Sequence, residues 1–280
     1  MFGGCGGNDT GETSFDGVLS FTGSSTLAPT ISQIADTFKN EYGTWDQVDD
    51  SLPETDIQIN VSTGGSGVGA KGVIEGTVHF GMLARDARDE EIEGIDDFRE
   101  YKLGMDALMV AVHKDNTLAQ KRDDLNTEEI RSIFSDEIKF WNEFDPDLSD
   151  GEVILLVRDV GGGAHGVFQD AIMGDVEVSA DAIEVPSMPG LVERLIDNPL
   201  AIGYASYGVA DQHREEITAF KVDGIEPSAE NILDGTYSIA RPLILVRSGD
   251  LSPAEEAFLD YIKSERGTEI LREMGFLPSS

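Results

Sequence analysis

The chain has 280 residues and, with 54 Asp or Glu against 20 Lys or Arg, a formal net charge of −34 at pH 7. Hydrophobic residues make up 40% of the sequence, which is enough for a packed core and argues against a disordered chain. The acidic charge argues against nucleic-acid and anionic-membrane partners, because both bind basic surfaces. The sequence has no run of about 18 apolar residues, so we predict no membrane-spanning helix. Its single cysteine excludes a disulfide within the chain.

The acidic residues are spread through the chain and are not gathered in a tail. Such a spread predicts a negative surface that repels itself at low ionic strength. At about 1 M salt the Debye length shortens to about 3 Å, and most of that repulsion is screened. We therefore favour a protein adapted to high salt, of halophilic, archaeon-like origin, over a merely acidic soluble protein.

Residues 1–14 are rich in glycine and polar side chains, and we expect them to form a disordered tether. Cys5 lies in this tether between two glycine pairs. It is either an incidental thiol or the lipid-bearing cysteine of an exported lipoprotein, although the basic and apolar parts of a signal are absent from this chain. We favour a lipid anchor and an extracellular, cell-surface location. One lipid chain binds a bilayer weakly, so firm attachment needs a second contact.

Three segments of the chain share the order strand, glycine-rich loop, helix. Pro29 fits only the first turn of a helix, so the first helix begins at about Ser25–Thr26. The predicted strands and loops are residues 18–21 and 22–26, residues 57–61 and 64–69, and residues 153–157 and 158–165. The second helix is expected at about 70–75, and the third passes through Phe168 and Ile172.

Each of these units predicts the same kind of site. A helix N-terminus presents unsatisfied backbone N–H groups and a partial positive charge, and glycines let the backbone approach a ligand closely. Serine and threonine hydroxyls add neutral donors. Three such units in one acidic chain therefore indicate convergence on one small oxyanion, with no metal and no cofactor.

An alternative interpretation of the second loop is a dinucleotide site. Gly67, Gly69 and Gly72 match the spacing of the dinucleotide fingerprint, and Asp86 or Asp89 lies near the position expected for the ribose-binding acid. This interpretation leaves the other two loops unexplained.

Five longer motifs resemble, in order and spacing, the phosphate-binding component of Pst-type ABC transporters, and the similarity covers residues from about 19 to 278. The motifs are GSSTLAP (23–29), GGSGVGAKGVIEGTVHFGMLAR (64–85), NTEEIRSIFSDEIKFW (126–141), PGLVERLIDNPLAIGY (189–204) and VDGIEPSAENILDGTYSIARPL (222–243). The resemblance implies a two-lobed α/β periplasmic-binding-protein fold of type II, with two hinge-crossing strands and a ligand cleft between the lobes.

We expect residues 15–106 plus 206–280 to form a discontinuous first lobe and residues 107–205 to form a second. An apolar strand over 107–112 is the expected crossing out, and residues 201–204 are the expected return. Ser252 and Glu255 predict a capping box for a last helix that continues to Gly275.

The resemblance also implies the ligand residues. In the first two loops these are Ser24, Ser25, Thr26, Ser66 and Gly67, and in the third loop the backbone of Gly162, Gly163, Ala164 and His165. Arg85 and Arg158 match family arginines, and a guanidinium suits a tetrahedral oxyanion because its paired N–H groups form charge-assisted bonds. For Arg85 the alternative is a structural ion pair with Asp86 or Asp89.

The third loop departs from the family pattern. Gly162 and Ala164 stand where relatives carry hydroxyls, and Ala84 replaces a frequent serine. His165 is either an additional donor or a histidine at the cleft rim or surface. The acid that accepts the proton of hydrogen phosphate in relatives has no secure match, and Asp86 and Asp159 are candidates. Sulfate, arsenate, molybdate and phosphonates therefore stay open beside phosphate.

The leading hypothesis is a monomeric, non-enzymatic solute-binding protein that captures phosphate outside the cell and delivers it to a membrane ABC permease by lobe closure. The alternative from another class is a phosphoesterase or a nucleotide-dependent oxidoreductase, although no familiar catalytic motif is present. A third hypothesis is a sensor or scaffold that has lost high affinity.

Overall fold

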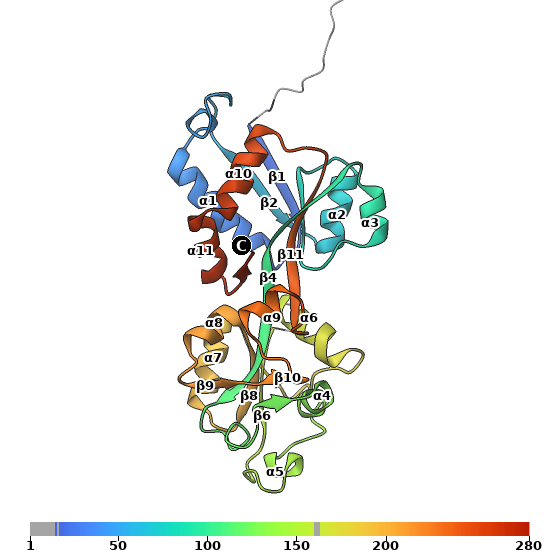
Figure 1. Cartoon of the computed structure of the whole chain (residues 1–280), viewed down its shortest axis with the longest axis vertical. Helices are drawn as coiled ribbons and strands as arrows, with labels where there is room; N and C mark the ends of the chain where they lie inside the picture. Colours follow the sequence, from blue (N-terminus) through green and yellow to red (C-terminus); the bar gives the residue numbers. More distant parts are fainter. Residues whose placement is uncertain (1–14, 16, 160–162, 280) are drawn as a thin grey trace, which may run out of the picture.

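The computed structural model describes residues 15, 17–159 and 163–279. They form two α/β lobes stacked along the long axis of the molecule (Figure 1). Two strands, β4 (Phe98–His113) and β11 (Ala240–Ser248), run antiparallel to each other between the lobes. The expected two-lobed α/β fold with two crossing strands is therefore confirmed.

The first lobe is a sheet with helices on both faces. From one edge, the sheet contains β2 (Gln58–Thr63), β1 (Val18–Gly23), β3 (Phe80–Leu83) and parts of β11 and β4, and β12 (Leu277–Pro278) pairs with β4. One face carries α1 (Ala28–Tyr42), α10 (Pro253–Lys263) and α11 (Glu265–Glu273), and the other carries α2 (Ser66–Ile74) and α3 (Asp89–Gly94) (Figure 1). A short 3₁₀ turn spans Trp45–Gln47.

The second lobe is built on the continuation of β4. Its sheet runs from β4 through β8 (Ala201–Ser206) and β6 (Ile154–Arg158) to β7 (Ile183–Val185), and β9 (Ile217–Ala219) pairs with the far end of β4. Short strands β5 (Asp124–Leu125) and β10 (Lys221–Val222) pair separately. The helices are α4 (Thr127–Phe134), α5 (Trp141–Phe144), α6 (Gly163–Phe168) with a π turn at Gln169–Met173, α7 (Met188–Asp197), α8 (Tyr207–Gln212) and α9 (Ala229–Leu233).

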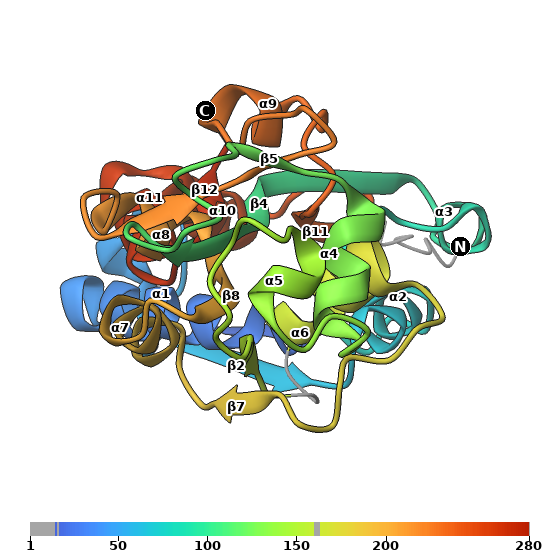
Figure 2. The same cartoon turned by 90° about the horizontal axis from the view of Figure 1, so that it is seen from below.

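Helices cover both faces of the second sheet. Seen from below, α7 and α8 lie on one side of β8, and α4 and α6 lie on the other (Figure 2). A sheet covered on both faces explains why β8 is buried along its whole length and is almost entirely apolar.

The return crossing differs from the prediction. Residues 201–204 belong to β8, which pairs with β4 and β6 inside the second lobe, so their assignment as the return strand is wrong. The chain stays in this lobe after β8, because β9 pairs with the far end of β4 and Phe220 and Ile232 are fully buried in the core. The packing places the second lobe between about Met105 and Ile239, and not between 107 and 205.

The predicted last helix is divided in two. Ser264 has extended backbone angles between α10 and α11, and its side chain accepts a hydrogen bond from the Gly267 N–H. A new N-cap therefore begins a second helix where apolar periodicity alone predicts one long helix. The expected capping box at the start of α10 is confirmed, since Ser252 and Glu255 each accept the other's backbone N–H.

No helix among the described residues is long and apolar enough to cross a membrane.

Candidate functional site

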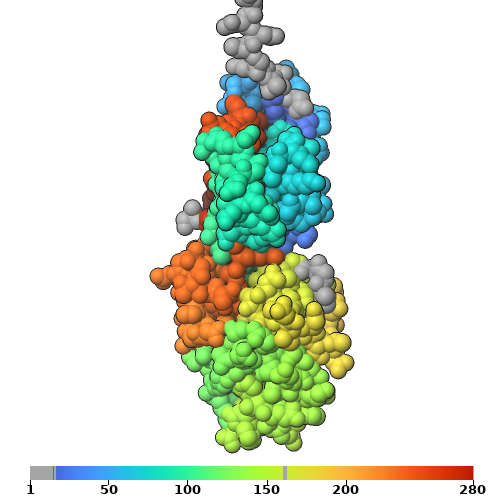
Figure 3. All heavy atoms as spheres, turned by 90° about the vertical axis from the view of Figure 1, so that its right-hand side faces the viewer, coloured from blue at the N-terminus to red at the C-terminus, as the bar shows by residue number. Residues whose placement is uncertain are grey.

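A pocket of about 250 Å³ lies where the two lobes meet. It is lined by Ser24, Ser25, Thr26, Gly65, Ser66, Ala84, Gly163 and Arg241. Figure 3 shows the segments of α2, in cyan, and of α6, in yellow, on opposite sides of the lobe boundary. Drug-sized ligands occupy pockets of about 300–1,000 Å³, so this pocket suits a small ion better than a dinucleotide.

Three hydroxyl groups at the pocket have oxygens that already act as acceptors. Ser24 Oγ accepts from the Thr26 N–H at 3.2 Å, and Ser66 Oγ accepts from the Ala84 N–H at 3.1 Å. Thr26 Oγ1 accepts from Nη2 of Arg241 at 2.8 Å. Within the described part of the chain no acceptor takes the hydrogens of these hydroxyls. Each hydroxyl can therefore donate to a ligand, which is the chemistry that an oxyanion requires.

The first two loops are fixed to each other by their backbones. The carbonyl of Gly23 accepts hydrogen bonds from the N–H groups of Gly64 and Gly65, each at 2.9 Å. Gly65 has φ +87°, a conformation that L side chains rarely adopt, and α2 begins at the next residue, Ser66. The N-terminus of α2 thus points its unsatisfied N–H groups toward the first loop.

Arg241 supplies the charge of the pocket, although it was not among the ligand residues predicted from the sequence. Among the described lining residues it is the one that carries a charge. It lies on β11 directly opposite Asp106 of β4, and its Nε and Nη2 donate to Asp106 Oδ2 at 3.2 and 3.1 Å. Burial raises the pKa of Asp106 above its usual range, and the Arg241 guanidinium opposes that rise.

Arg85 forms a structural ion pair, with a partner other than the expected Asp86 or Asp89. Its Nη1 and Nη2 donate to the two carboxylate oxygens of Glu91 at 2.8 Å each. Glu91 is buried, and its hydrogen bonds from Arg85 hold the pKa of its carboxyl below the usual range. Arg85 does not line the pocket, and its role as a ligand stays a prediction.

The structure does not bring Arg158 into the pocket either. Its Nε donates to the Val185 carbonyl at 3.0 Å, and its Nη2 donates to Asp159 at 2.7 Å and to the Pro186 carbonyl at 3.2 Å. These bonds hold the guanidinium against β7 and the following loop. The Asp159 carboxylate, a candidate proton acceptor, is thereby engaged with Arg158.

His165 is a buried residue of α6, and neither a cleft-rim nor a surface position describes it. Its Nδ1 lies 3.2 Å from the hydroxyl of Tyr204, which accepts the Arg158 N–H and so has its own hydrogen available for the ring. Burial lowers the pKa of His165 below its ordinary value of 6.5.

The remaining predicted ligand residues lie as follows. Ala164 packs against the hydrophobic core of the second lobe, and Gly67 follows Ser66 on α2. Gly162 and Cys5 lie outside the described residues.

The glycine spacing of the second loop serves packing. A Cβ on Gly69 would lie 2.9 Å from the Met82 carbonyl oxygen, and one on Gly72 would lie 3.0 Å from the Thr22 side chain. These glycines let α2 approach β1 and β3 closely. The resemblance to a dinucleotide fingerprint therefore has a structural explanation.

Two of the larger hollows lie on the surfaces of individual lobes. One of about 420 Å³ adjoins β9 and β10, and one of about 590 Å³ lies between α1 and the α10–α11 junction. Neither is formed by glycine-rich loops, and both mix basic with acidic side chains. The smaller interlobe pocket therefore remains the candidate site.

Residues 8–266 match the family model described as a PBP superfamily domain. The phosphate-binding protein PstS of Bacillus subtilis (strain 168) is 30% identical over 271 residues, which cover 96% of this chain and 83% of that protein. The crystal structure of PstS from Borrelia burgdorferi has a TM-score of 0.69 at 23% identity, covering 93% of this chain and 98% of that one. An ABC-type phosphate transport receptor from Vibrio cholerae has a TM-score of 0.68 at 21% identity, covering 92% and 99%.

Proposed function

Because the chain belongs to the PBP superfamily and, within it, to the PstS family of phosphate-binding proteins, we propose that it captures inorganic phosphate between its lobes and delivers it to an ABC permease. The observation that carries the proposal is the set of hydroxyl donors on Ser24, Thr26 and Ser66, converging on a pocket whose charge comes from Arg241. Such a pocket takes an acceptor-rich anion.

The mechanism is binding followed by closure, with no bond broken. The hydroxyls and the N-terminus of α2 belong to the first lobe, and Gly163 belongs to the second, so the lining of the pocket is complete only when the lobes are together. A ligand that binds this closed arrangement better than an open one shifts the population toward it. A non-enzymatic role is supported by the relatives that the chain matches, which are phosphate-binding proteins.

The proposed setting is the extracellular face of the membrane. We propose a monomer attached through Cys5 and presenting its closed form to the permease. Light scattering of the purified chain measures the oligomeric state, and metabolic labelling with a radioactive precursor of the host's membrane lipids, compared with a Cys5→Ser chain, tests the anchor. Equal labelling of both chains would contradict it.

Calorimetric titration at about 2 M KCl, a salt concentration that screens the acidic surface, tests the ligand. We expect phosphate to bind with micromolar or lower Kd, and sulfate and molybdate to give no signal. Ser66→Ala should weaken phosphate binding by about 1.5–3 kcal/mol, because one hydrogen bond to a charged ligand is lost. Ser228→Ala, which removes the N-cap of α9 in the second lobe, is the control and should bind as the unchanged chain does. A folded chain without phosphate binding would refute the proposal.

A further inference from the structure

Arg241 belongs neither to the glycine-rich loops nor to the helix N-termini that form the rest of the site. It lies on β11, one of the two strands that connect the lobes, and not on a glycine-rich loop. Its side chain is 19% exposed and lines the pocket, whereas that of Asp106 behind it is 4% exposed. The guanidinium therefore has one edge against a buried carboxylate and another toward the pocket.

One nitrogen of this guanidinium touches both lobes. Nη2 donates to Thr26 Oγ1 of the first lobe at 2.8 Å and to the Gly163 carbonyl of the second lobe at 2.6 Å. It also lies 3.1 Å from Asp106 Oδ2. Nη2 has two hydrogens for these three acceptors, so its capacity is fully used.

The hydrogens on the other terminal nitrogen, Nη1, are available to a ligand. Nη1 of Arg241 makes no hydrogen bond to any described residue, although Nε and Nη2 are both engaged. An anion in the pocket can therefore accept from Nη1 while Nη2 keeps its bonds to Thr26 and Gly163. Asp106 fixes the plane of the guanidinium, because both Nε and Nη2 donate to its Oδ2.

We propose that Arg241 is the cation that contacts the bound anion, and that its bonds to Thr26 and Gly163 couple lobe closure to anion binding. The bond to Gly163 exists only while the second lobe lies against the first, so separation of the lobes removes one of its acceptors. Asp106 acts as a positioning residue that holds the guanidinium at the crossing. The inference rests on the proposed function, because it assigns a binding and closing role within the same site.

The test compares Arg241→Lys and Arg241→Gln with the unchanged chain, by phosphate calorimetry and by small-angle scattering with and without phosphate. Lysine keeps a charge but cannot reproduce the guanidinium geometry, so we expect roughly tenfold weaker binding, and roughly hundredfold for glutamine. Both variants should contract less than the unchanged chain at saturating phosphate. A merely structural arginine would not alter this contraction.

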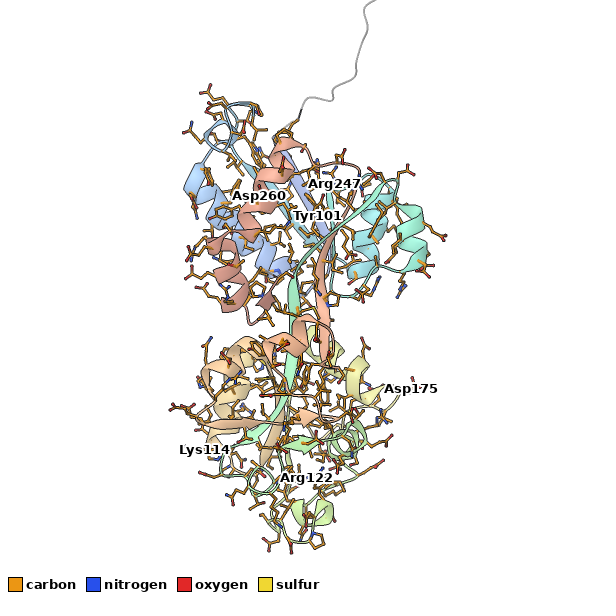
Figure 4. The ribbon with its side chains drawn as sticks, in the orientation of Figure 1. Tyr101, Lys114, Arg122, Asp175, Arg247 and Asp260 are labelled. Carbon is orange, nitrogen blue, oxygen red and sulfur yellow. The ribbon has the colours of Figure 1, made fainter. Side chains whose placement is uncertain are left out.

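Arg247→Lys is the matched control. Arg247 lies on the same strand and pairs with the buried Glu255 at 2.5 Å, but its place is in the first lobe away from the second (Figure 4). This variant should lose thermal stability and bind phosphate within about twofold of the unchanged chain, since its site contacts are intact. If the Arg241 variants lose phosphate affinity and Arg247→Lys does not, the loss arises in the pocket and not from breaking a buried ion pair.

Folded Arg241 variants that bind phosphate and contract as the unchanged chain does would overturn the inference while leaving phosphate capture intact. If the unchanged chain binds sulfate and not phosphate, phosphate capture fails and the variants are compared on sulfate. If it binds no oxyanion, both proposals fail. If neither variant folds, a phosphate-bound crystal structure of the unchanged chain decides, with Nη1 expected within about 3 Å of a phosphate oxygen. A longer separation would overturn the inference.

Discussion

Gly163 is a residue at which the two lobes touch. A Cβ added there would collide with Thr26 Oγ1 and would lie 2.9 Å from Arg241 Nη2. The absence of a side chain at this position is therefore a condition for closure, and the backbone of Gly163 was among the predicted ligand groups.

Replacing Gly163 with alanine should weaken phosphate binding by about tenfold or more, because the methyl group separates Thr26 from Arg241 and each misplaced charged hydrogen bond is costly. Gly166→Ala, at a position of the same helix where a Cβ meets nothing within 4 Å, is the control. Calorimetry measures both. Equal affinities for the two variants would show that the lobes do not close as described.

Arg85 provides a second residue-scale prediction. Arg85→Met leaves the buried Glu91 without its bidentate partner, which should lower the free energy of unfolding by about 3 kcal/mol. Phosphate affinity should stay close to that of the unchanged chain. Arg88→Met, which removes an exposed pair with Glu90, should change stability by less than about 1 kcal/mol. Denaturant titrations provide both values, and a large loss of phosphate affinity in Arg85→Met would instead support the ligand role.

His165 makes stability depend on pH. Its pKa is lowered in the folded chain by burial, so the unfolded chain binds a proton first as pH falls. The stabilising contribution is complete above the ordinary value near 6.5 and is lost as pH falls below it. His165→Gln should therefore show a shallower decline in unfolding free energy between about pH 6.5 and pH 5. His213→Gln, at a half-exposed position, is the control, and equal slopes for His165→Gln and the unchanged chain would contradict the assignment.

The residues of the site differ in how far the sequence reveals them. Ser24, Thr26 and Ser66, named through the family resemblance, line the pocket, and glycine-rich loops after apolar strands are a local signal for such positions. Their role as ligands stays a prediction. Arg241 has no such signal, since it sits within a strand beside Pro242 and meets Asp106 only through pairing across 135 residues. Arg158 matched a family motif, yet its partners on β7 depend on packing that sequence spacing does not report.

At the scale of elements, strands and helix starts were easier to predict than connections. The strand at 107–112 was found, because β4 is an uninterrupted apolar run there, but β4 begins at Phe98 and residues 107–112 already belong to the second lobe. The return was misplaced because β8 and β11 both contain a buried apolar run, and only strand pairing distinguishes them. Helix α2 begins at Ser66 and not near residue 70, since Ser66 and Gly67 already have helical geometry despite their low helix propensity.

The capping box of α10 supports an element-scale prediction. Ser252→Ala removes the side-chain acceptor for the Glu255 N–H and should lower the free energy of unfolding by about 1 kcal/mol. Ser51→Ala, at an exposed turn position outside any helix, should change it by less than about 0.5 kcal/mol. Urea titrations at fixed salt compare the two. No difference between them would mean that water or Glu255 alone satisfies the helix start.

At the scale of the whole molecule, acidic charge is kept almost entirely at the surface. Among the described carboxylates, Glu91, Asp106 and Glu255 are buried, and each is paired with an arginine. Arginine suits this use because its planar fork satisfies a desolvated carboxylate with two hydrogen bonds. The remaining acids produce a negative surface whose self-repulsion must be screened.

We therefore expect the Tm to rise when KCl is increased from about 0.1 M to about 2 M, because the Debye length falls from about 10 Å to a few ångströms. Sucrose at matched osmolality is the control, since it stabilises by exclusion without screening charge. Calorimetric or fluorescence melting follows both series. A Tm that is insensitive to KCl, or that rises equally in sucrose, would argue against adaptation to high salt.

The placement of the chain ends has a consequence for how the molecule is synthesised. The second lobe is one continuous stretch from about Met105 to Ile239, whereas the first lobe needs β11, α10 and α11 from the end of the chain. The whole second lobe therefore leaves the ribosome before β11, the strand that pairs with β3 in the first-lobe sheet, has been synthesised. Although nascent chains usually fold from the N-terminus, here we expect the second lobe to fold first. Arg241 emerges after both other parts of the pocket, so the anion site is completed late in synthesis.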